Sequence, residues 1–289
     1  MNKHDQLHRF LFDGLDVRGE LVQMDASWKA ILERYSYPEN VRNQLGQAMA
    51  ASLLLSATIK FEGSLILQVQ SKGPLTTLVA QATHQRTVRG LARWQGDVPD
   101  GDLANTYGPG QMVLTIDNIG KERYQGIVGM EGEALAHTLE AYFEKSEQLA
   151  TRLWLAADGE RAAGLFIQEM PGEQKHEDDR QRIAMLADTV TPDEMLTLTP
   201  EELLHRLFNE EQVRLFDPEP VAFRCGCSKE RIATTLRAMG YADVKEILDS
   251  HGKIQADCDF CNRQYNFDKV DVEQIFAQDV DIATPKTSH

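Results

Sequence analysis

Short runs in which apolar and polar residues alternate fill much of the first 170 residues of this chain. Alternation of this kind is typical of strands that bury one face, and Gly, Pro and Asn separate the runs. The predicted strands are SLILQVQ (64–70), TTLVAQAT (76–83), TVRGLARW (87–94), QMVLTID (111–117), YQGIVGM (124–130), TRLWLAA (151–157) and AAGLFIQEM (162–170).

Helical patterns lie before and between these strands. Asp25 predicts an N-cap for a helix that continues to Tyr35, and Pro38 begins a longer helix, PENVRNQLGQAMAASLLLSATIK. Another helix is predicted over residues 133–148. Strands in series with helices at the margins predict an α+β fold with an antiparallel sheet for residues 1–170, and not a series of βαβ units.

Residues 171–224 differ in character and predict an acidic, amphipathic helical linker. Thr191-Pro-Asp-Glu194 and Thr199-Pro-Glu-Glu202 repeat one helix-start signal, with Thr at the N-cap, Pro at N1 and Glu at N3. Helices this short are unstable alone in water, so we expect them to fold only against a neighbour. The apolar stripe of the second helix is Leu203, Leu204, Leu207 and Phe208. An ordinary helical connector explains the same pattern equally well.

Acidic residues outnumber basic ones in every part of the chain, and the formal net charge is −15. There are 16 basic against 21 acidic residues in 1–170, 6 against 13 in 171–224, and 8 against 11 in 225–289. Binding to nucleic acid requires cations that displace counterions from phosphates. The charge therefore disfavours nucleic acid as a partner.

The chain carries no sign of export or of a membrane span. MNKHDQLHRFLFDG lacks the apolar stretch of a signal peptide, and no apolar run is long enough to cross a bilayer. We expect a soluble protein of the cytosol with no membrane partner.

No arrangement of residues typical of an enzyme is present. The eight histidines are scattered without metal-ligand spacing, and the phosphate-binding Gly-rich motifs are absent. The glycines of GIVGMEGE are typical of a strand-to-helix turn, and the aspartates of QGDVPDGDLA do not match a calcium loop. The sequence thus predicts a protein that is not an enzyme and binds no nucleotide.

The four cysteines lie in two tight pairs near the end of the chain. Cys225-Gly-Cys227 and Cys258-Asp-Phe-Cys261 give the pattern C-x-C…C-x-x-C in a predicted module of residues 225–289. Four soft sulfur ligands are the number that a structural zinc ion takes in a closed tetrahedral site. We therefore predict one bound zinc ion, with His251 an unneeded substitute ligand.

Two other interpretations of the cysteine pairs are less favoured than a zinc site. Permanent disulfides are disfavoured because the cytosol is reducing. A thioredoxin-like dithiol at Cys258 and Cys261 is disfavoured because Asp257 and Asp259 flank Cys258 and RQYNFDKV is typical of a strand, whereas a reactive thiol needs nearby cations or a helix N-terminus.

A comparison of the free energies of zinc binding and of local disulfides predicts that the zinc site acts as a switch. Structural zinc contributes roughly 10–16 kcal/mol of apparent binding free energy. If an oxidant instead closed each pair into its own disulfide, each small loop would contribute only about 2 kcal/mol. Oxidation is then expected to unfold the module and deprive the preceding segment of its packing partner. The apolar residues that would be uncovered are Leu203, Leu204, Leu207, Phe208, Val213, Leu215 and Phe216.

With these features the chain closely resembles the heat-shock protein 33 family over essentially its whole length. The resemblance rests on the spacing of the cysteine pairs, and on YFEKSEQLATRLWLA, GPLTTLVAQAT with VRGLARW, and AAGLFIQEMP. It implies a redox-regulated holdase chaperone of the cytosol that needs no ATP. The four cysteines would bind zinc when reduced. Oxidation would form the disulfides Cys225–Cys227 and Cys258–Cys261, release zinc, unfold module and linker, and yield a homodimer that binds unfolding proteins.

Two hypotheses from other classes remain alongside this one. A permanent zinc ribbon that binds RNA would show a salt-dependent shift of RNA, which the acidic charge disfavours. A thiol–disulfide oxidoreductase would reduce insulin and lose that activity on Cys258→Ser.

Overall fold

The computed structural model describes residues 5–130, 132–170 and 177–277 of the 289-residue chain. By the density of its contacts the chain divides into a first unit, residues 1–224, and a second unit, residues 225–289. Each unit has its own apolar core and is described by itself. No helix among the described residues is long and apolar enough to span a membrane.

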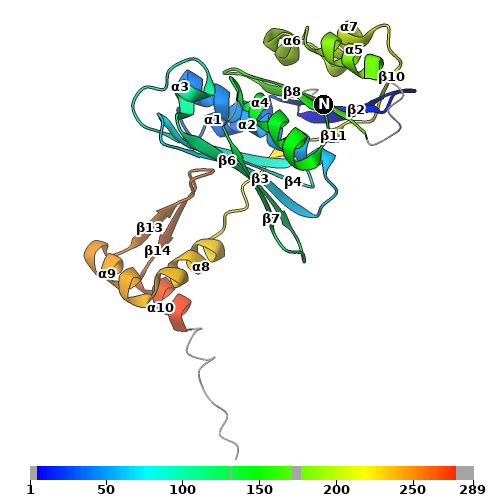
Figure 1. Ribbon diagram of the computed structural model, residues 1–289. Helices are drawn as coiled ribbons and strands as arrows, with labels where there is room; N and C mark the ends of the chain where they lie inside the picture. The colour runs from blue at the N-terminus through cyan, green and yellow to red at the C-terminus, as the bar shows by residue number, and fades with distance from the viewer. Residues whose placement is uncertain (1–4, 131, 171–176, 278–289) are drawn as a thin grey trace, which may run out of the picture. The chain divides into compact units, whose positions relative to one another are not determined.

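Two β-sheets form the framework of the first unit (Figure 1). One, which we call sheet A, contains β10 (Val213–Leu215), β1 (Gln6–Phe12), β2 (Val17–Met24), β9 (Ala162–Glu169) and β8 (Thr151–Ala157) in that order, with β11 (Glu219–Pro220) also paired to β1. The other, sheet B, contains β12 (Ala222–Phe223), β5 (Thr87–Trp94), β4 (Leu75–Thr83), β3 (Gly63–Ser71), β6 (Gly110–Asn118) and β7 (Tyr124–Gly129).

Helix α2 (Glu39–Thr58) contacts strands of both sheets and lies in the main core of the first unit. Its middle, Ala48 to Ser56, is buried on all sides, which is the pattern of a helix enclosed by other elements. Small residues allow the close approach: a Cβ atom at Gly164 of β9 would meet Leu54 Cδ1 at 2.7 Å. The remaining helices of this region are α1 (Ala26–Leu32), α3 (Leu103–Tyr107), α4 (Leu135–Tyr142) and the π-helical turn η1 (Phe143–Glu147).

The other face of sheet A is covered by α5 (Glu177–Ala187), α6 (Pro192–Thr197) and α7 (Pro200–Phe208) (Figure 1). A second apolar cluster forms there. Its sheet residues are Phe10, Phe12, Val17, Leu21, Ala156, Ala163, Leu165 and Ile167. Sheet A therefore has apolar side chains on both faces, because α2 buries one and the helices of the acidic segment bury the other.

The second unit is built from α8 (Lys229–Met239), α9 (Tyr241–His251), the hairpin β13 (Ile254–Asp257) and β14 (Gln264–Phe267), and α10 (Lys269–Ala277). Its core is small. The buried members are Leu236, Val244, Leu248, Ile254, Phe267, Val272 and Ile275. The segment between the cysteine pairs thus consists of two helices and a strand.

The α+β prediction is confirmed, and each of the seven predicted strands is present. The expectation of one sheet was incomplete, because β1 and β2 were not predicted and they join β8 and β9 in a separate sheet. One pairing, β12 with β5, is parallel. The two predicted capping boxes are present at Thr191 and Thr199, where each threonine accepts from its glutamate's backbone N–H.

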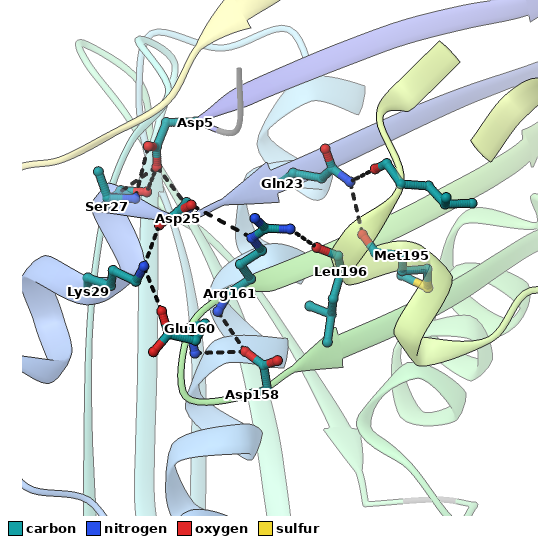
Figure 2. A network of polar contacts seen from close by, with 12 residues as sticks. Asp5, Gln23, Asp25, Ser27, Lys29, Asp158, Glu160, Arg161, Met195 and Leu196 are labelled. Carbon is teal, nitrogen blue, oxygen red and sulfur yellow. Dashed lines mark hydrogen bonds and ion pairs between the residues drawn. The ribbon is translucent and has the colours of Figure 1, made fainter. Parts of the chain in front are cut away.

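Asp25 is the N-cap of α1, as predicted, but the helix ends at Leu32 and does not continue to Tyr35. Helix α1 begins at Ala26, but no side chain of Asp25 caps it. The carboxylate of Asp5 accepts hydrogen bonds from the backbone N–H groups of Asp25, Ala26 and Ser27, and from the Ser27 hydroxyl (Figure 2). A residue 20 positions earlier satisfies the helix N-terminus, which local sequence cannot reveal.

A buried carboxyl group, Glu20, lies on the α2 side of sheet A near three arginines. Arg9, Arg18 and Arg86 donate to the last carbonyls of α2, those of Ala57, Thr58 and Ser56. Glu20 is 2% exposed, and its Oε2 has no hydrogen-bond partner among the described residues. Burial raises the pKa of Glu20 from 4.5 to about 7, although the arginines, Arg18 foremost, act to lower it.

Stability of the first unit should therefore depend on this group. A carboxyl pKa that is raised in the folded state favours folding at low pH, and the free energy of unfolding falls as pH rises from about 4.5 through 7. Glu20→Gln should remove up to about 3 kcal/mol of this fall, and the variant should exceed the unmodified chain in stability at pH 8. Urea unfolding followed by tryptophan fluorescence measures this, because Trp28, Trp94 and Trp154 all lie in the first unit. The exposed Glu62→Gln is the control, and an identical pH profile for both variants would contradict the assignment.

Candidate metal centre and the segment before it

The first cysteine pair lies between the end of one unit and the first helix of the other. Only Arg224 separates β12 from Cys225 in the sequence. Cys227 is followed by Ser228, the N-cap of α8, whose hydroxyl accepts from the Arg231 backbone N–H at 3.3 Å. A helix start thus fixes the backbone directly after the second sulfur ligand.

The second pair occupies the tight turn of the hairpin β13–β14. The backbone N–H groups of Cys261 and Asn262 donate to the Cys258 carbonyl at 3.3 and 2.8 Å, and that of Cys258 donates to the Arg263 carbonyl at 2.9 Å. Asn262 has a φ of 55°, a left-handed conformation that asparagine tolerates better than most residues. The turn holds both side chains on one side of the hairpin end.

The four sulfur atoms form one cluster. They all lie within 4.8 Å of one another, with Cys225 Sγ 3.6 Å from Cys258 Sγ and Cys227 Sγ 3.3 Å from Cys261 Sγ. These separations are far longer than a disulfide bond, and the cysteines are not disulfide-bonded. A tetrahedral zinc ion with sulfur ligands at roughly 2.3 Å places them about 3.8 Å apart, so the cluster fits four-sulfur coordination.

Neighbouring groups make the Cys227 thiol more acidic than those of Cys258 and Cys261. Burial acts to raise the pKa of Cys227, but hydrogen bonds from Tyr265 and the other cysteines lower it to about 7. Burial raises the pKa of Cys258, and it raises that of Cys261 to about 12. The Tyr265 hydroxyl lies 3.1 Å from Cys227 Sγ. A bound divalent cation would favour the thiolate form at all four positions.

Tyr265 is a residue that the sequence analysis missed. The sequence predicts a strand over RQYNFDKV; a strand is present at Gln264–Phe267, whereas α10 begins at Lys269. Only the hairpin register directs the hydroxyl to the sulfur. His251 ends α9, where its ring nitrogen lies 3.1 Å from the Ile247 carbonyl oxygen. Within the described residues the four cysteines are the group close enough to share an ion.

The predicted apolar stripe of the acidic segment is buried in this structure. Leu203, Leu204, Leu207 and Phe208 are each at most 5% exposed. Leu215 is half-buried, and Phe216 is 42% exposed. The Phe208 ring meets that of Phe12 edge-on with ring centres 4.9 Å apart, and the Phe10 ring lies 6.5 Å away. These contacts place α7 on the outer face of sheet A.

The sequence predicts that this segment packs against the cysteine module and loses that partner when the module unfolds. This prediction of the packing partner is wrong. The cluster that buries the stripe consists of residues of the first unit, chiefly from β1, β2 and β9. The physical reason is that β1 and β2, which were not predicted, provide a second apolar sheet face to cover.

Polar side chains also attach α6 to sheet A (Figure 2). The Gln23 amide donates to the carbonyl oxygens of Met195 at 2.9 Å and Leu198 at 2.8 Å, and Arg161 Nη1 donates to that of Leu196 at 2.7 Å. Arg161 also pairs with Asp25, which pairs with Lys29. The last carbonyls of a helix need such partners, so this network fixes where α6 ends on the sheet.

The arrangement defines a class: an α+β protein with a small C-terminal module that carries a four-cysteine metal-type cluster. Comparison with known proteins agrees. The family model described as Hsp33 protein matches residues 5–268. A 33 kDa chaperonin of Nitrosococcus oceani is 62% identical over the full length of both chains. One from a Shewanella species is 43% identical over 274 residues, which cover 94% of this chain and 96% of the relative.

A solved structure extends the likeness to the fold. The crystal structure of the 33 kDa chaperonin from Thermotoga maritima superposes with a TM-score of 0.83 at 22% identity, and covers 96% of this chain and all of that one. The chain belongs to the Hsp33 family, a chaperone family and not an enzyme class.

The hydrogen bond from Tyr265 gives a prediction for metal affinity. Groups that hydrogen-bond to metal ligands typically contribute a factor of 10–100 to affinity. Tyr265→Phe should therefore weaken zinc binding by about tenfold without changing the stoichiometry, as measured by competition with a chromophoric chelator. Tyr241→Phe removes a comparable hydroxyl that donates to Glu273 and should bind zinc as the unmodified chain does. Equal affinities for the two variants would assign Tyr265 no part in the site.

Proposed function

We propose that this protein is a redox-regulated, ATP-independent holdase of the cytoplasm. Cys225, Cys227, Cys258 and Cys261 bind one zinc ion in the reduced state. Oxidation converts them to the disulfides Cys225–Cys227 and Cys258–Cys261, and the zinc is released. The oxidised protein forms a homodimer and binds unfolding proteins, with no part for nucleic acid or membrane. The observation that carries the proposal is the position of the sulfur cluster directly after the segment that covers the apolar face of sheet A.

The geometry of the cluster leaves the disulfide pairing open. All four sulfur atoms lie within 4.8 Å of one another, and close separations of 3.6 and 3.3 Å occur between the pairs. The proposed pairing within each pair rests on the short loops and the family resemblance. It matters because disulfides between the pairs would keep the two ends of the module joined, whereas disulfides within each pair would not.

Zinc loss should destabilise the second unit strongly. The site contributes roughly 10–16 kcal/mol when occupied, and the small loops closed by local disulfides return only about 2 kcal/mol each. The apolar core from Leu236 to Ile275 also joins α8 to β13, β14 and α10, a tie that the sequence analysis did not foresee. A core of seven buried residues is marginal for a module of this size. Heat combined with oxidation is therefore the expected trigger.

Unfolding of the second unit must then be transmitted along the chain to the acidic segment. The strands that end this segment are short: three residues in β10, two in β11 and two in β12. Their end is fixed at Cys225 while the second unit is folded. Once that unit unfolds, fraying of these strands has less cost, and the helices α5–α7 can follow.

Detachment would uncover two complementary apolar surfaces. One is the stripe of α7 with Leu203, Leu204, Leu207 and Phe208, flanked by Leu215 and Phe216. The other is the outer face of sheet A with Phe10, Phe12, Val17, Leu21, Leu165 and Ile167. Large exposed apolar patches are the usual mark of a protein-binding surface. Both are proposed as client-binding surfaces.

The principal test follows zinc and chaperone activity together. We expect peroxide at heat-shock temperature to release one zinc ion per chain and to oxidise the four cysteine thiols. The oxidised protein should then suppress light scattering by an aggregating client. Reduced protein should not suppress it. Zinc release without suppression of aggregation would refute the holdase function. Mass spectrometry of the oxidised protein after proteolysis distinguishes local disulfides from disulfides between the pairs.

A second prediction concerns the attachment of α6. Gln23→Leu removes two hydrogen bonds to buried or half-buried carbonyls, which should weaken docking of the acidic segment by about 1–3 kcal/mol. The variant should suppress aggregation after milder heating in peroxide than the unmodified chain. Gln81→Leu, which loses a bond to Arg89 within sheet B, is the matched control. If both variants need the same temperature, Gln23 does not set the release of the segment.

A further inference from the structure

The outer edge of β1 is closed by the acidic segment alone among the described elements. On one side β1 pairs with β2. On the other side it pairs with β10 and then β11, and without these two short strands β1 would be the edge of sheet A. Phe10 lies opposite Leu215 and Phe12 opposite Val213, while Leu7 lies opposite Glu219. The stretch from 212 to 221 therefore serves as a discontinuous edge strand.

The backbone bonds along this edge are well formed. The Asp13 N–H donates to the Gln212 carbonyl at 2.8 Å, the Phe216 N–H to that of Arg9 at 2.9 Å, and the Val221 N–H to that of Asp5 at 2.9 Å. If the segment leaves, these groups of β1 lose their partners. Unpaired strand edges are templates for another extended chain.

Prolines interrupt the discontinuous edge strand of residues 212–221. Pro218 and Pro220 have no N–H to donate, so they interrupt the ladder between β10 and the end of the segment. A continuous strand on the same edge could form more hydrogen bonds with β1 than this interrupted one does. Once the segment has left, a continuous strand would therefore bind this edge of β1 more strongly than the segment does.

One acidic side chain of the segment fills a cationic site beside this edge. Glu219 Oε1 lies 2.8 Å from Arg9 Nη1, and Glu219 Oε2 lies 2.8 Å from Arg86 Nε. The Arg86 side chain is 8% exposed and also donates to the Ser56 carbonyl at 2.9 Å. Without Glu219, the two guanidinium groups would lose the carboxylate that pairs with both and would retain only the buried carboxyl group of Glu20 nearby among the described residues. Such cations favour a further anion that can reach them.

We propose that β1 is a client-binding edge: after release of the acidic segment it binds an extended stretch of an unfolding protein by antiparallel strand addition, with an acidic client side chain on Arg9 and Arg86. This inference rests on the proposed release of the segment. The segment 210–222 is then an internal substitute for the client. Strand addition recognises any unfolded chain by its backbone, and the arginine pair adds a preference for an acidic residue.

Charge disfavours a second copy of the chain at this edge. β1 reads QLHRFLF, with Arg9 at its centre and no acidic residue. Antiparallel pairing of two β1 strands about that centre would place Arg9 opposite Arg9, and like charges directly opposite each other are destabilising.

The test uses the full-length protein and a labelled peptide of residues 210–222, EEQVRLFDPEPVA. Fluorescence anisotropy should show the peptide binding to oxidised protein and at least tenfold more weakly to reduced protein. The Glu219→Lys peptide should bind oxidised protein at least tenfold more weakly, and Arg9→Glu protein should restore its binding. Arg89→Gln, a variant in sheet B, is the control and should bind both peptides as the unmodified protein does. Equal binding of both peptides to oxidised protein would overturn the arginine preference.

Hydrogen exchange separates this inference from the proposed function. Oxidation should expose the amides of Asp13, Phe216 and Val221; if they stay protected, the release of the segment itself fails. If they become exposed, a permanently unfolded protein such as reduced, carboxymethylated α-lactalbumin should restore protection in residues 5–13. Continued exchange there at saturating client would overturn strand addition. Protection that rises with protein concentration alone, and that client does not alter, would assign the edge to a second copy and also overturn it.

Discussion

The structure of the first unit depends on the packing of α5–α7 against the outer face of sheet A. Because α2 already buries the inner face, β1, β2 and β9 carry apolar side chains on both sides, and exposing either face to water is unfavourable. The ring of Phe10 lies across Gly19 of the neighbouring strand, where a Cβ atom would come within 2.1 Å of it. This flat aromatic surface receives Phe208 from α7. The acidic segment is thus a cover for a sheet that would otherwise be exposed.

The same constraint explains the charge of the cover. A segment that is apolar on its inner side, and that is proposed to leave the sheet after oxidation, gains from a strongly charged outer side that stays hydrated when free. Its helices are individually short, and two of them begin with capping boxes that do not depend on the sheet. Its attachment rests on apolar contacts together with a few polar links at Gln23, Arg161 and the Arg9–Glu219 pair. Several moderate interactions can be lost together once one end is no longer held.

In the proposed function, the sulfur cluster controls that end because of its place in the chain. A metal bound within a small, weakly stabilised module would make the folding of that module conditional on four reduced thiols. Arg224 alone separates the last strand of the cover from Cys225. Chemistry at the sulfurs can therefore reach sheet A through the covalent chain. The inner side of the same sheet holds a different conditional group, the buried Glu20, which lies near the arginines that donate to the end of α2.

By itself the sequence determined the elements whose signals are local: seven strands with two-residue alternation, the long helix after Pro38, the two capping boxes, and the paired cysteines that predict a metal site. The tertiary structure alone decided which surfaces meet. It placed Asp5 at the start of α1, Tyr265 on Cys227, Gln23 and Arg161 under α6, and Glu219 between two arginines, all through contacts between residues distant in the sequence. It also moved the partner of the acidic segment from the cysteine module to sheet A. Periodicity shows that a face is apolar, but only the assembled sheets show which other face is left for it to cover.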